Sequence, residues 1–304
     1  MPLIKRVLLF VITNIAVMGM FGLVLIILGM LGLPVDPTTL TGLLLLSLVV
    51  GFSGALISLA MSRFIALRSV GGTVIAHPHT EEERWLVNEV AALSKKLGLK
   101  MPLVAIYPST ELNAFATGPT RNRSLVAVSS GILKMMRREE LEGVLGHEMT
   151  HVANGDMVTM TLLQGILNTF VYFIARIVSD IVRERMDFGV SSYIAISMML
   201  QVIFGLLASL IIAAFSRHRE YRADAGSAHL LGKEKMIHAL KALASNLEAK
   251  KAAMSARIKE KQLIRESEGA YSATAFGING VKRNWFSTHP TLSDRIKRLE
   301  NNQY

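Results

Sequence analysis

Four long apolar stretches divide the chain, and more polar segments lie between and after them. The first two run from Val7 to about Leu33 and from Leu40 to Met61. The third runs from Met157 to Val178 with polar interruptions, and the fourth from Ser192 to Phe215. Because about 20 apolar residues cross a bilayer as a helix, each stretch is long enough to span a membrane.

The first two stretches form a predicted transmembrane hairpin. Lys5 and Arg6 precede it and Arg63 and Arg68 follow it, whereas the connecting loop, residues 34–39, has no lysine or arginine. By the positive-inside rule both ends of the hairpin are cytoplasmic. The first stretch is too long for a cleaved signal peptide and is interpreted as a retained anchor.

The third and fourth stretches allow two interpretations. The loop between them holds Arg183 and Arg185 beside Glu184 and Asp187, which fits the positive-inside rule poorly. Either both stretches cross the membrane as a second hairpin, or the third lies partly buried in protein. In both cases the chain returns to the side on which residue 156 lies.

The polar segments carry helix and strand patterns. Residues Thr80–Glu83 form a capping box that opens an amphipathic helix, and Gly98 ends it. Three β-like runs follow, at residues 103–107, 113–117 and 125–129. Helices dominate elsewhere: residues 233–268 are predicted as a polar helix with a solvated or membrane-facing surface, and Thr291 caps a terminal helix. The sequence therefore predicts an α+β, mainly helical fold.

Composition supports a membrane protein and restricts its chemistry. Of the 304 residues, 51% are hydrophobic, and the formal net charge is +10. The basic residues lie beside apolar segments and in the last third of the chain, without interleaved aromatic residues. Anionic lipid therefore explains the charge better than nucleic acid does. There is no cysteine, so a transition-metal site must use histidine and carboxylate ligands.

The segment His147-Glu148-Met149-Thr150-His151 has the pattern H-E-x-x-H. Residues i and i+4 share a face of a helix, so both imidazoles can bind one metal ion. Zinc held in this way lowers the pKa of a water molecule, and Glu148 is placed to take its proton. The alternative is a pair of helical histidines that serve only as polar core or surface residues.

Glu220 is the candidate third ligand. It shares a helix face with Asp224, which is a candidate acceptor that orients a ligand histidine. The alternative is a charged helix start at a membrane surface. The longer H-E-x-x-H-x-x-G-x-x-H class is excluded, because Asn154 and Met157 occupy the positions of its glycine and third histidine.

Two further features bear on substrate binding. The strand run that includes Asn113, Ala114 and Phe115 can bind an extended peptide by strand addition, or can be an ordinary small sheet. His289 precedes the cap of the terminal helix, where it serves either as an oxyanion hydrogen-bond donor or as a structural loop histidine.

Over essentially its full length the chain resembles the M48 peptidases, the Ste24/HtpX-type family of membrane metalloproteases. The matching motifs are the N-terminal hairpin, Asn113–Gly118, Leu145–Asp156, Glu220–Asp224 and His289-Pro290. The resemblance implies a zincin-like domain with His147, His151 and Glu220 as ligands of one Zn²⁺. It implies that Glu148 is the catalytic base, that Asp224 lies behind the ligands, and that residues 113–118 bind substrate. The roles of His289 and Arg295 do not follow from spacing.

The resulting hypothesis is a multi-pass zinc endopeptidase of the bacterial cytoplasmic (inner) membrane with its catalytic domain facing the cytoplasm. It would cleave misfolded or damaged membrane proteins as part of quality control and the stress response, with unfolded or membrane proteins and the lipid bilayer as partners and no nucleic acid. The predicted organisation is a hairpin at residues 1–69, catalytic parts at 70–156 and 217–304, and a second hydrophobic hairpin at 157–216.

Two rival functions are disfavoured. A silent scaffold with structural zinc has no need of Glu148 and lacks a cysteine to close the metal site. A metal transporter would carry its ligands inside the spans, whereas the three candidate ligands lie in polar flanks.

Overall fold

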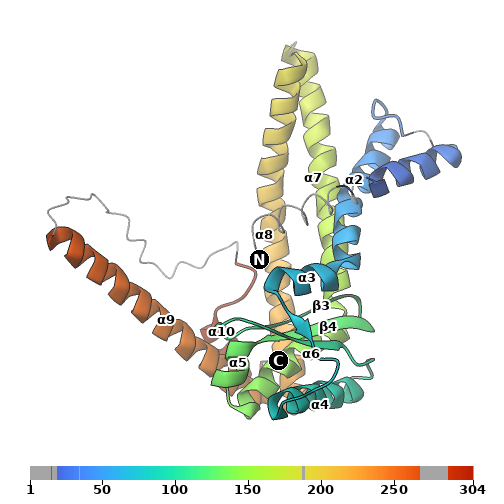
Figure 1. Cartoon of the computed structure of the whole chain (residues 1–304). Coiled ribbons are helices and arrows are strands. Elements are labelled where there is room, and N and C mark those ends of the chain that lie inside the picture. The colour runs from blue at the N-terminus through green and yellow to red at the C-terminus, as the bar shows by residue number, and fades with distance from the viewer. Residues whose placement is uncertain (1–14, 16–18, 34, 187–188, 268–286, 304) are drawn as a thin grey trace.

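The structure is a computed structural model that describes residues 15, 19–33, 35–186, 189–267 and 287–303. A bundle of long helices rises from a more compact body of helices and strands (Figure 1). Much of the predicted first span, Val7 to Leu33, lies outside the described residues; within it, helix Gly19–Met30 is described.

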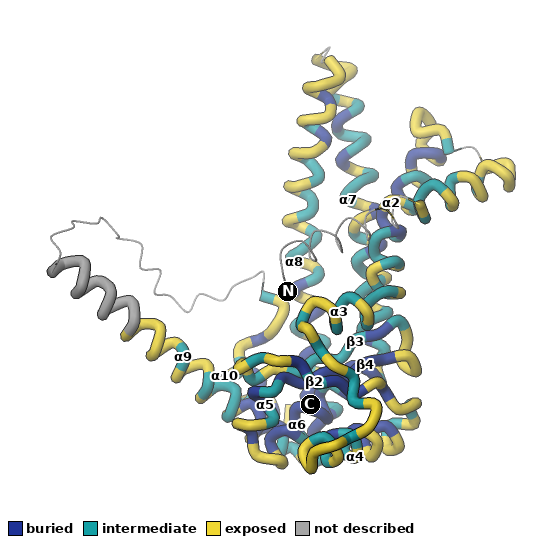
Figure 2. Tube along the Cα trace, in the orientation of Figure 1, coloured by how far each residue is buried: buried dark blue, intermediate teal, exposed yellow. Residues whose placement is uncertain are grey.

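The other three predicted spans are helices in the structure. They are α2 (Leu40–Ala60), α7 (Asp156–Met186) and α8 (Val190–Leu231), and all three are long and apolar enough to cross a membrane. Only 11% of the most apolar window of α7 is buried. Exposed residues recur along α7 and α8, among residues of intermediate exposure (Figure 2). The low burial is what the spanning interpretation of the third stretch predicts, while the partly buried interpretation stays an alternative.

Small residues let α2 and α7 approach closely. A Cβ atom on Gly51 would lie 2.3 Å from the Thr169 hydroxyl, and one on Gly165 would lie 2.5 Å from the ring of Phe52. Close contact at glycine and threonine is typical of helix packing in membranes, where apolar lipid gives no hydrophobic drive for helices to associate.

The body contains a four-stranded sheet of order β1-β2-β4-β3. Its strands are β1 (Thr73–Val74), β2 (Leu103–Tyr107), β3 (Ala114–Thr120) and β4 (Arg123–Ser129). The three predicted strands are confirmed, and β1 is an addition, because two residues carry too little periodicity to be recognised. β2 and β4 pair in parallel, while β3 pairs only with β4, antiparallel, and so forms an edge.

Alternating side chains of the sheet contact two layers of helices. One face packs on α4 (Glu81–Lys96) and α6 (Arg138–Asn154), and the short helix α5 (Ser130–Met135) follows β4. The other face is covered by α3 (Ser62–Val70). The predicted capping box of α4 is confirmed, since the Thr80 hydroxyl accepts a hydrogen bond from the Glu83 amide at 3.1 Å.

Helix α8 continues without a break from its apolar half into the body, across residues 216 and 217. There it packs tightly on α6: a Cβ atom on Gly226 would lie 2.2 Å from a side-chain carbon of Thr150, and one on Gly146 would lie 2.6 Å from the Ser227 hydroxyl. The Ser227 hydroxyl donates a hydrogen bond to the carbonyl of Gly143 at 2.9 Å. These contacts join the two parts of the body.

Helices α9 (Lys233–Ser267) and α10 (Leu292–Glu300) complete the body. The prediction of a solvated polar helix for residues 233–268 is wrong for its start, where Met236 and Leu240 are buried against Leu299 of α10. The lysine-rich composition conceals these apolar positions. Farther along, α9 extends away from the body (Figure 1).

Candidate metal centre

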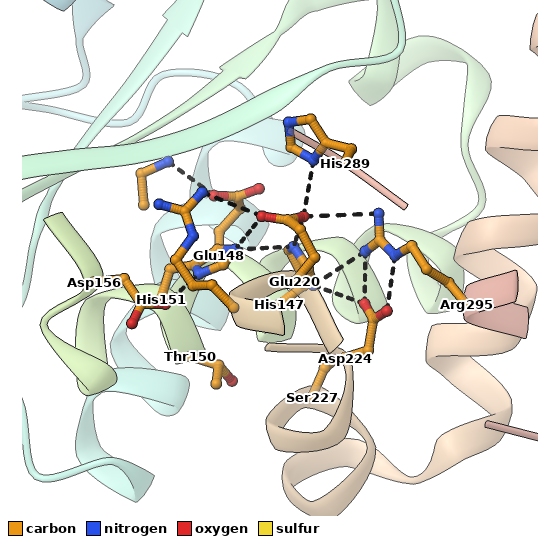
Figure 3. Close-up of polar contacts among 12 residues, drawn as sticks. His147, Glu148, Thr150, His151, Asp156, Glu220, Asp224, Ser227, His289 and Arg295 are labelled. Carbon is orange, nitrogen blue, oxygen red and sulfur yellow. Dashed lines mark hydrogen bonds and ion pairs between the residues drawn. The ribbon is translucent and has the colours of Figure 1, made fainter. Parts of the chain in front are cut away.

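Helix α6 brings two histidines to one point. His147 and His151 are both buried, and their Nε2 atoms lie 3.1 Å apart. Glu220 of α8 reaches the same point: its Oε2 is 3.4 Å from Nε2 of His147, and its Oε1 is 3.4 Å from Nε2 of His151. The three side chains converge between the two helices (Figure 3). The structure thus places all three predicted ligands together.

The spacing of these atoms suits a divalent metal ion. Metal–ligand bonds of about 2.0–2.2 Å in tetrahedral geometry separate neighbouring ligand atoms by about 3.3–3.5 Å. The two histidine nitrogens lie 3.1 Å apart, and each lies 3.4 Å from a different oxygen of the Glu220 carboxylate, which is close to this range. Two imidazoles and a carboxylate also form a donor set that zinc accepts. The residues therefore fit a metal ion with one open position for water or substrate.

The Asp224 carboxylate contacts the ring nitrogen of His147 that points away from the other candidate ligands, as the sequence predicts. Asp224 Oδ1 lies 2.9 Å from Nδ1 of His147. Arg295 of α10 holds the same carboxylate through two hydrogen bonds, from Nε at 2.7 Å and from Nη2 at 2.6 Å. A ligand histidine whose second nitrogen bonds a carboxylate is fixed in tautomer and orientation.

A second carboxylate, that of Asp156, supports His151, and the sequence analysis did not predict this contact. Asp156 Oδ2 lies 2.6 Å from Nδ1 of His151, and Asp156 is 1% exposed. Arg222 of α8 pairs with the other oxygen of this carboxylate. The available signal is an acidic residue five positions after the second histidine, immediately after Gly155, whose φ of +68° turns the chain back.

Charge is concentrated around the ligands. Burial alone lowers the pKa of His147, but hydrogen bonds with Asp224 and Glu220 raise it to about 9. Burial raises the pKa of the Glu220 carboxyl, but hydrogen bonds with the three neighbouring histidines hold it well below its usual range. Protonated imidazole thus balances buried carboxylate in the metal-free site, a balance that a bound cation would take over.

Glu148 lies beside the ligands on α6. Its Oε2 accepts a hydrogen bond from the backbone amide of Ala116 on the edge strand β3 at 2.9 Å. The same glutamate lines a cavity of about 360 Å³ together with the two histidines and Glu220. No sequence pattern predicts the Ala116 contact, because a backbone amide carries no residue signature.

The remaining predicted residues border this cavity. Asn113, Ala114 and Phe115 lie along one wall, and His289 contributes to another. Nδ1 of His289 is 3.0 Å from Oε2 of Glu220, while its side chain is 63% exposed. The other lining side chains are mostly apolar and include Leu112, Ile132, Val144, Met157, Met236 and Leu243. The cavity is therefore an apolar groove with its polar groups gathered at the metal centre.

The chain is similar in sequence to known proteins. The family model described as Peptidase family M48 matches residues 80–303. Protease HtpX of Klebsiella pneumoniae subsp. pneumoniae is 46% identical over 313 residues, covering 98% of this chain and 99% of that protein. Protease HtpX of an Enterobacter species is 47% identical over 312 residues, with the same coverage.

A solved structure shows the same fold at greater distance. The crystal structure of Ste24p from S. mikatae superposes with a TM-score of 0.55 at 18% identity, covering 84% of this chain and 57% of that one. The match to the family model, the identity to the HtpX proteases and the converging metal ligands agree with one another. The chain belongs to peptidase family M48, and it is a membrane metalloprotease.

Proposed function

We propose that this metalloprotease is a zinc-dependent endopeptidase that cleaves misfolded or damaged membrane proteins at the cytoplasmic face of the bacterial inner membrane, in quality control and the stress response. The observation that carries the proposal is the triangle of ligand atoms of His147, His151 and Glu220 with Glu148 beside it. One Zn²⁺ per chain would be held by these three ligands, and it would supply Lewis-acid activation of water and of the peptide carbonyl.

The protein's own groups would carry the proton transfers. Glu148 takes a proton from the attacking water and then delivers it to the leaving amide nitrogen. His289 lines the same cavity, and its imidazole donates a hydrogen bond to the oxyanion as charge develops. Asp224 and Asp156 keep the two ligand histidines in one tautomer and one orientation.

The edge strand would hold the substrate. β3 pairs with β4 on one side only, and its residues Ala114 and Phe115 border the cavity together with Asn113, which directly precedes the strand. An extended peptide that adds to this edge runs past Glu148 with its backbone hydrogen bonded, and its side chains enter the apolar groove. Backbone pairing makes such binding tolerant of sequence, as a quality-control protease requires.

The position of the cavity favours membrane proteins as substrates. Met157, the second residue of α7, lines the cavity, and Glu220 follows the apolar stretch of α8 by five residues, since that stretch ends at Phe215. About 1.5 Å of helix per residue puts Glu220 within about 8 Å of that end. The catalytic groups therefore lie where a span emerges from the bilayer, within reach of exposed segments next to the membrane.

The charges at the opposite end of α7 and α8 are compatible with a second transmembrane hairpin. The guanidinium carbons of Arg176 and Arg183 lie 5.0 and 5.5 Å from the ring centre of Tyr193, whose hydroxyl donates to Asp180 at 2.8 Å. Arginines held on an interfacial tyrosine are tolerated at the far membrane surface. The basic residues after α2 and after the apolar part of α8 then mark the cytoplasmic side.

The test compares the detergent-purified wild type with Glu148→Gln. Both are assayed for bound metal and for cleavage of an unfolded protein substrate, with and without a chelator. Equal zinc content, with chelator-sensitive cleavage by the wild type only, is the expected result. Equal zinc with no cleavage by either protein across several substrates would instead favour a scaffold, and full activity of Glu148→Gln would refute the assigned base.

A further inference from the structure

Helix α3 lies between the membrane helices and the sheet. It begins at Ser62, two residues after α2 ends at Ala60, and it turns away from the direction of α2 to lie across the top of the body (Figure 1). The end of the predicted span α2 is therefore joined directly to a short helix, α3, at the level of the membrane surface.

The two faces of α3 have different environments. Ala66, Leu67 and Val70 pack on the buried sheet residues of the underlying layer. At 100° per residue, Phe64 and Arg68 point away from that face. Phe64 is 49% exposed, and the guanidinium carbon of Arg68 lies 5.4 Å from the centre of its ring. The outer face of α3 thus presents an aromatic ring paired with a cation.

A second arginine, Arg121, lies near the start of α7, another predicted span. Arg121, in the turn between β3 and β4, places its side-chain carbons 3.5–3.6 Å from where a Cβ on Gly155 would lie. Gly155 directly precedes α7. Within the described part of the chain, the structure records no ion pair for Arg68 or for Arg121, and both residues are exposed. Two cations that pair with no carboxylate of the described residues therefore lie on α3, just after α2, and beside the start of α7.

We propose that Phe64, Arg68 and Arg121 form a lipid-docking face that seats the protease domain on anionic phospholipid headgroups. Phe64 and Arg68 follow the end of the apolar helix α2 by four and eight residues, and Arg121 lies beside the start of α7. The charge of this face complements anionic lipid, and aromatic rings with basic neighbours favour the headgroup region. Docking would hold the sheet, and the cavity at its edge, at a fixed height above the bilayer. The proposal requires only that the chain is embedded in a membrane, and it is independent of the assigned catalytic roles.

The lack of cysteine allows a direct test. Phe64→Cys is labelled with an environment-sensitive fluorophore, and the full-length protein is reconstituted into vesicles of phosphatidylcholine and phosphatidylglycerol that contain a shallow spin-labelled quencher lipid. Glu82→Cys is the matched control, because Glu82 is an exposed residue of α4 on the opposite face of the sheet. Strong quenching at position 64 and little at position 82 are expected.

Charge variants then separate docking from simple proximity to the bilayer. Arg68→Gln and Arg121→Gln should each lower the ratio of quenched to unquenched label about fivefold, and vesicles of phosphatidylcholine alone should do the same in the parent protein. Bound metal, measured in every variant, reports correct folding. Quenching at position 64 no greater than at position 82 would overturn the proposal, as would quenching that ignores both the arginines and the anionic lipid.

Discussion

Oδ2 of Asp156 lies 2.6 Å from Nδ1 of His151, so that the first residue of the membrane helix α7 touches a metal ligand of α6. Asp224 contacts Nδ1 of His147 in the same way, at 2.9 Å. Each carboxylate is in turn held by an arginine from another helix. The metal centre therefore has a carboxylate behind each histidine, one at the start of α7 and one on α8.

Asp156→Ala should weaken metal binding about 10–100-fold, the usual cost of removing a carboxylate behind a ligand histidine. Asp156→Asn should cost less, because its amide oxygen still accepts a hydrogen bond from Nδ1 of His151. Competition with a calibrated chelator measures the affinity, and the visible spectrum of the cobalt-substituted protein reports the ligand geometry. Asp294→Asn, at a partly exposed position at the start of α10, is the control.

A fall in thermal stability without a change in metal affinity would contradict this role for Asp156. Arg222→Gln gives a second check, because it leaves the carboxylate in place and removes its partner. We expect an effect smaller than that of Asp156→Ala, and no added effect when the two substitutions are combined, since both act through one contact.

Arg295→Lys should impair the centre even though the charge is kept. Arg295 holds both oxygens of the Asp224 carboxylate, and an ammonium group cannot make the same pair of parallel hydrogen bonds. We expect a loss of about 1.5–3 kcal/mol in stability or in metal binding, because the substitution removes a hydrogen bond between charged groups while keeping the charge. Calorimetry with and without added metal distinguishes a loss of stability from a loss of metal binding. Wild-type values for both would refute the contact.

Gly226→Ala should separate α8 from α6. The added methyl group would meet Thr150 at 2.2–3.0 Å, so Glu220, two turns earlier on α8, would be displaced from the histidines. Overpacking of this kind costs about 1–3 kcal/mol, and we expect a parallel loss of bound metal. Gly205→Ala on the same helix is the control, because nothing lies within 4 Å of its added carbon. Adding Thr150→Ala should partly restore stability and bound metal in the double variant.

Metal uptake should release protons in a pH-dependent manner. The pKa of His147 in the metal-free protein is raised to about 9, so this residue is protonated below that pH and must lose the proton to bind a metal. Titration calorimetry in buffers of different ionisation enthalpy should show release of about one proton at about pH 7 and progressively less as the pH rises through about 9. Metal affinity should rise over the same interval. Asp224→Asn should shift this fall in proton release to lower pH, because Asp224 raises the pKa of His147.

Local patterns allowed much of the fold to be predicted. The i, i+4 spacing of His147 and His151, the capping box at Thr80 and the lengths of the apolar stretches all depend on neighbours along the chain, and each has the expected form in the structure. The start of α9 was misjudged because single apolar side chains buried by a distant helix leave no periodic signal.

What the sequence determined by itself is that two histidines share a helix face, that a carboxylate stands beside them and that three of the described helices can enter a membrane. The tertiary structure alone decided that Glu220 completes the triangle, that Asp156 supports His151, and that β3 lies at the sheet edge with the Ala116 amide on Glu148. The reason is physical. Helix periodicity is a local property of the backbone, whereas these contacts depend on how closely α8 packs against α6 and on which strand remains unpaired, and both are settled only when distant segments meet.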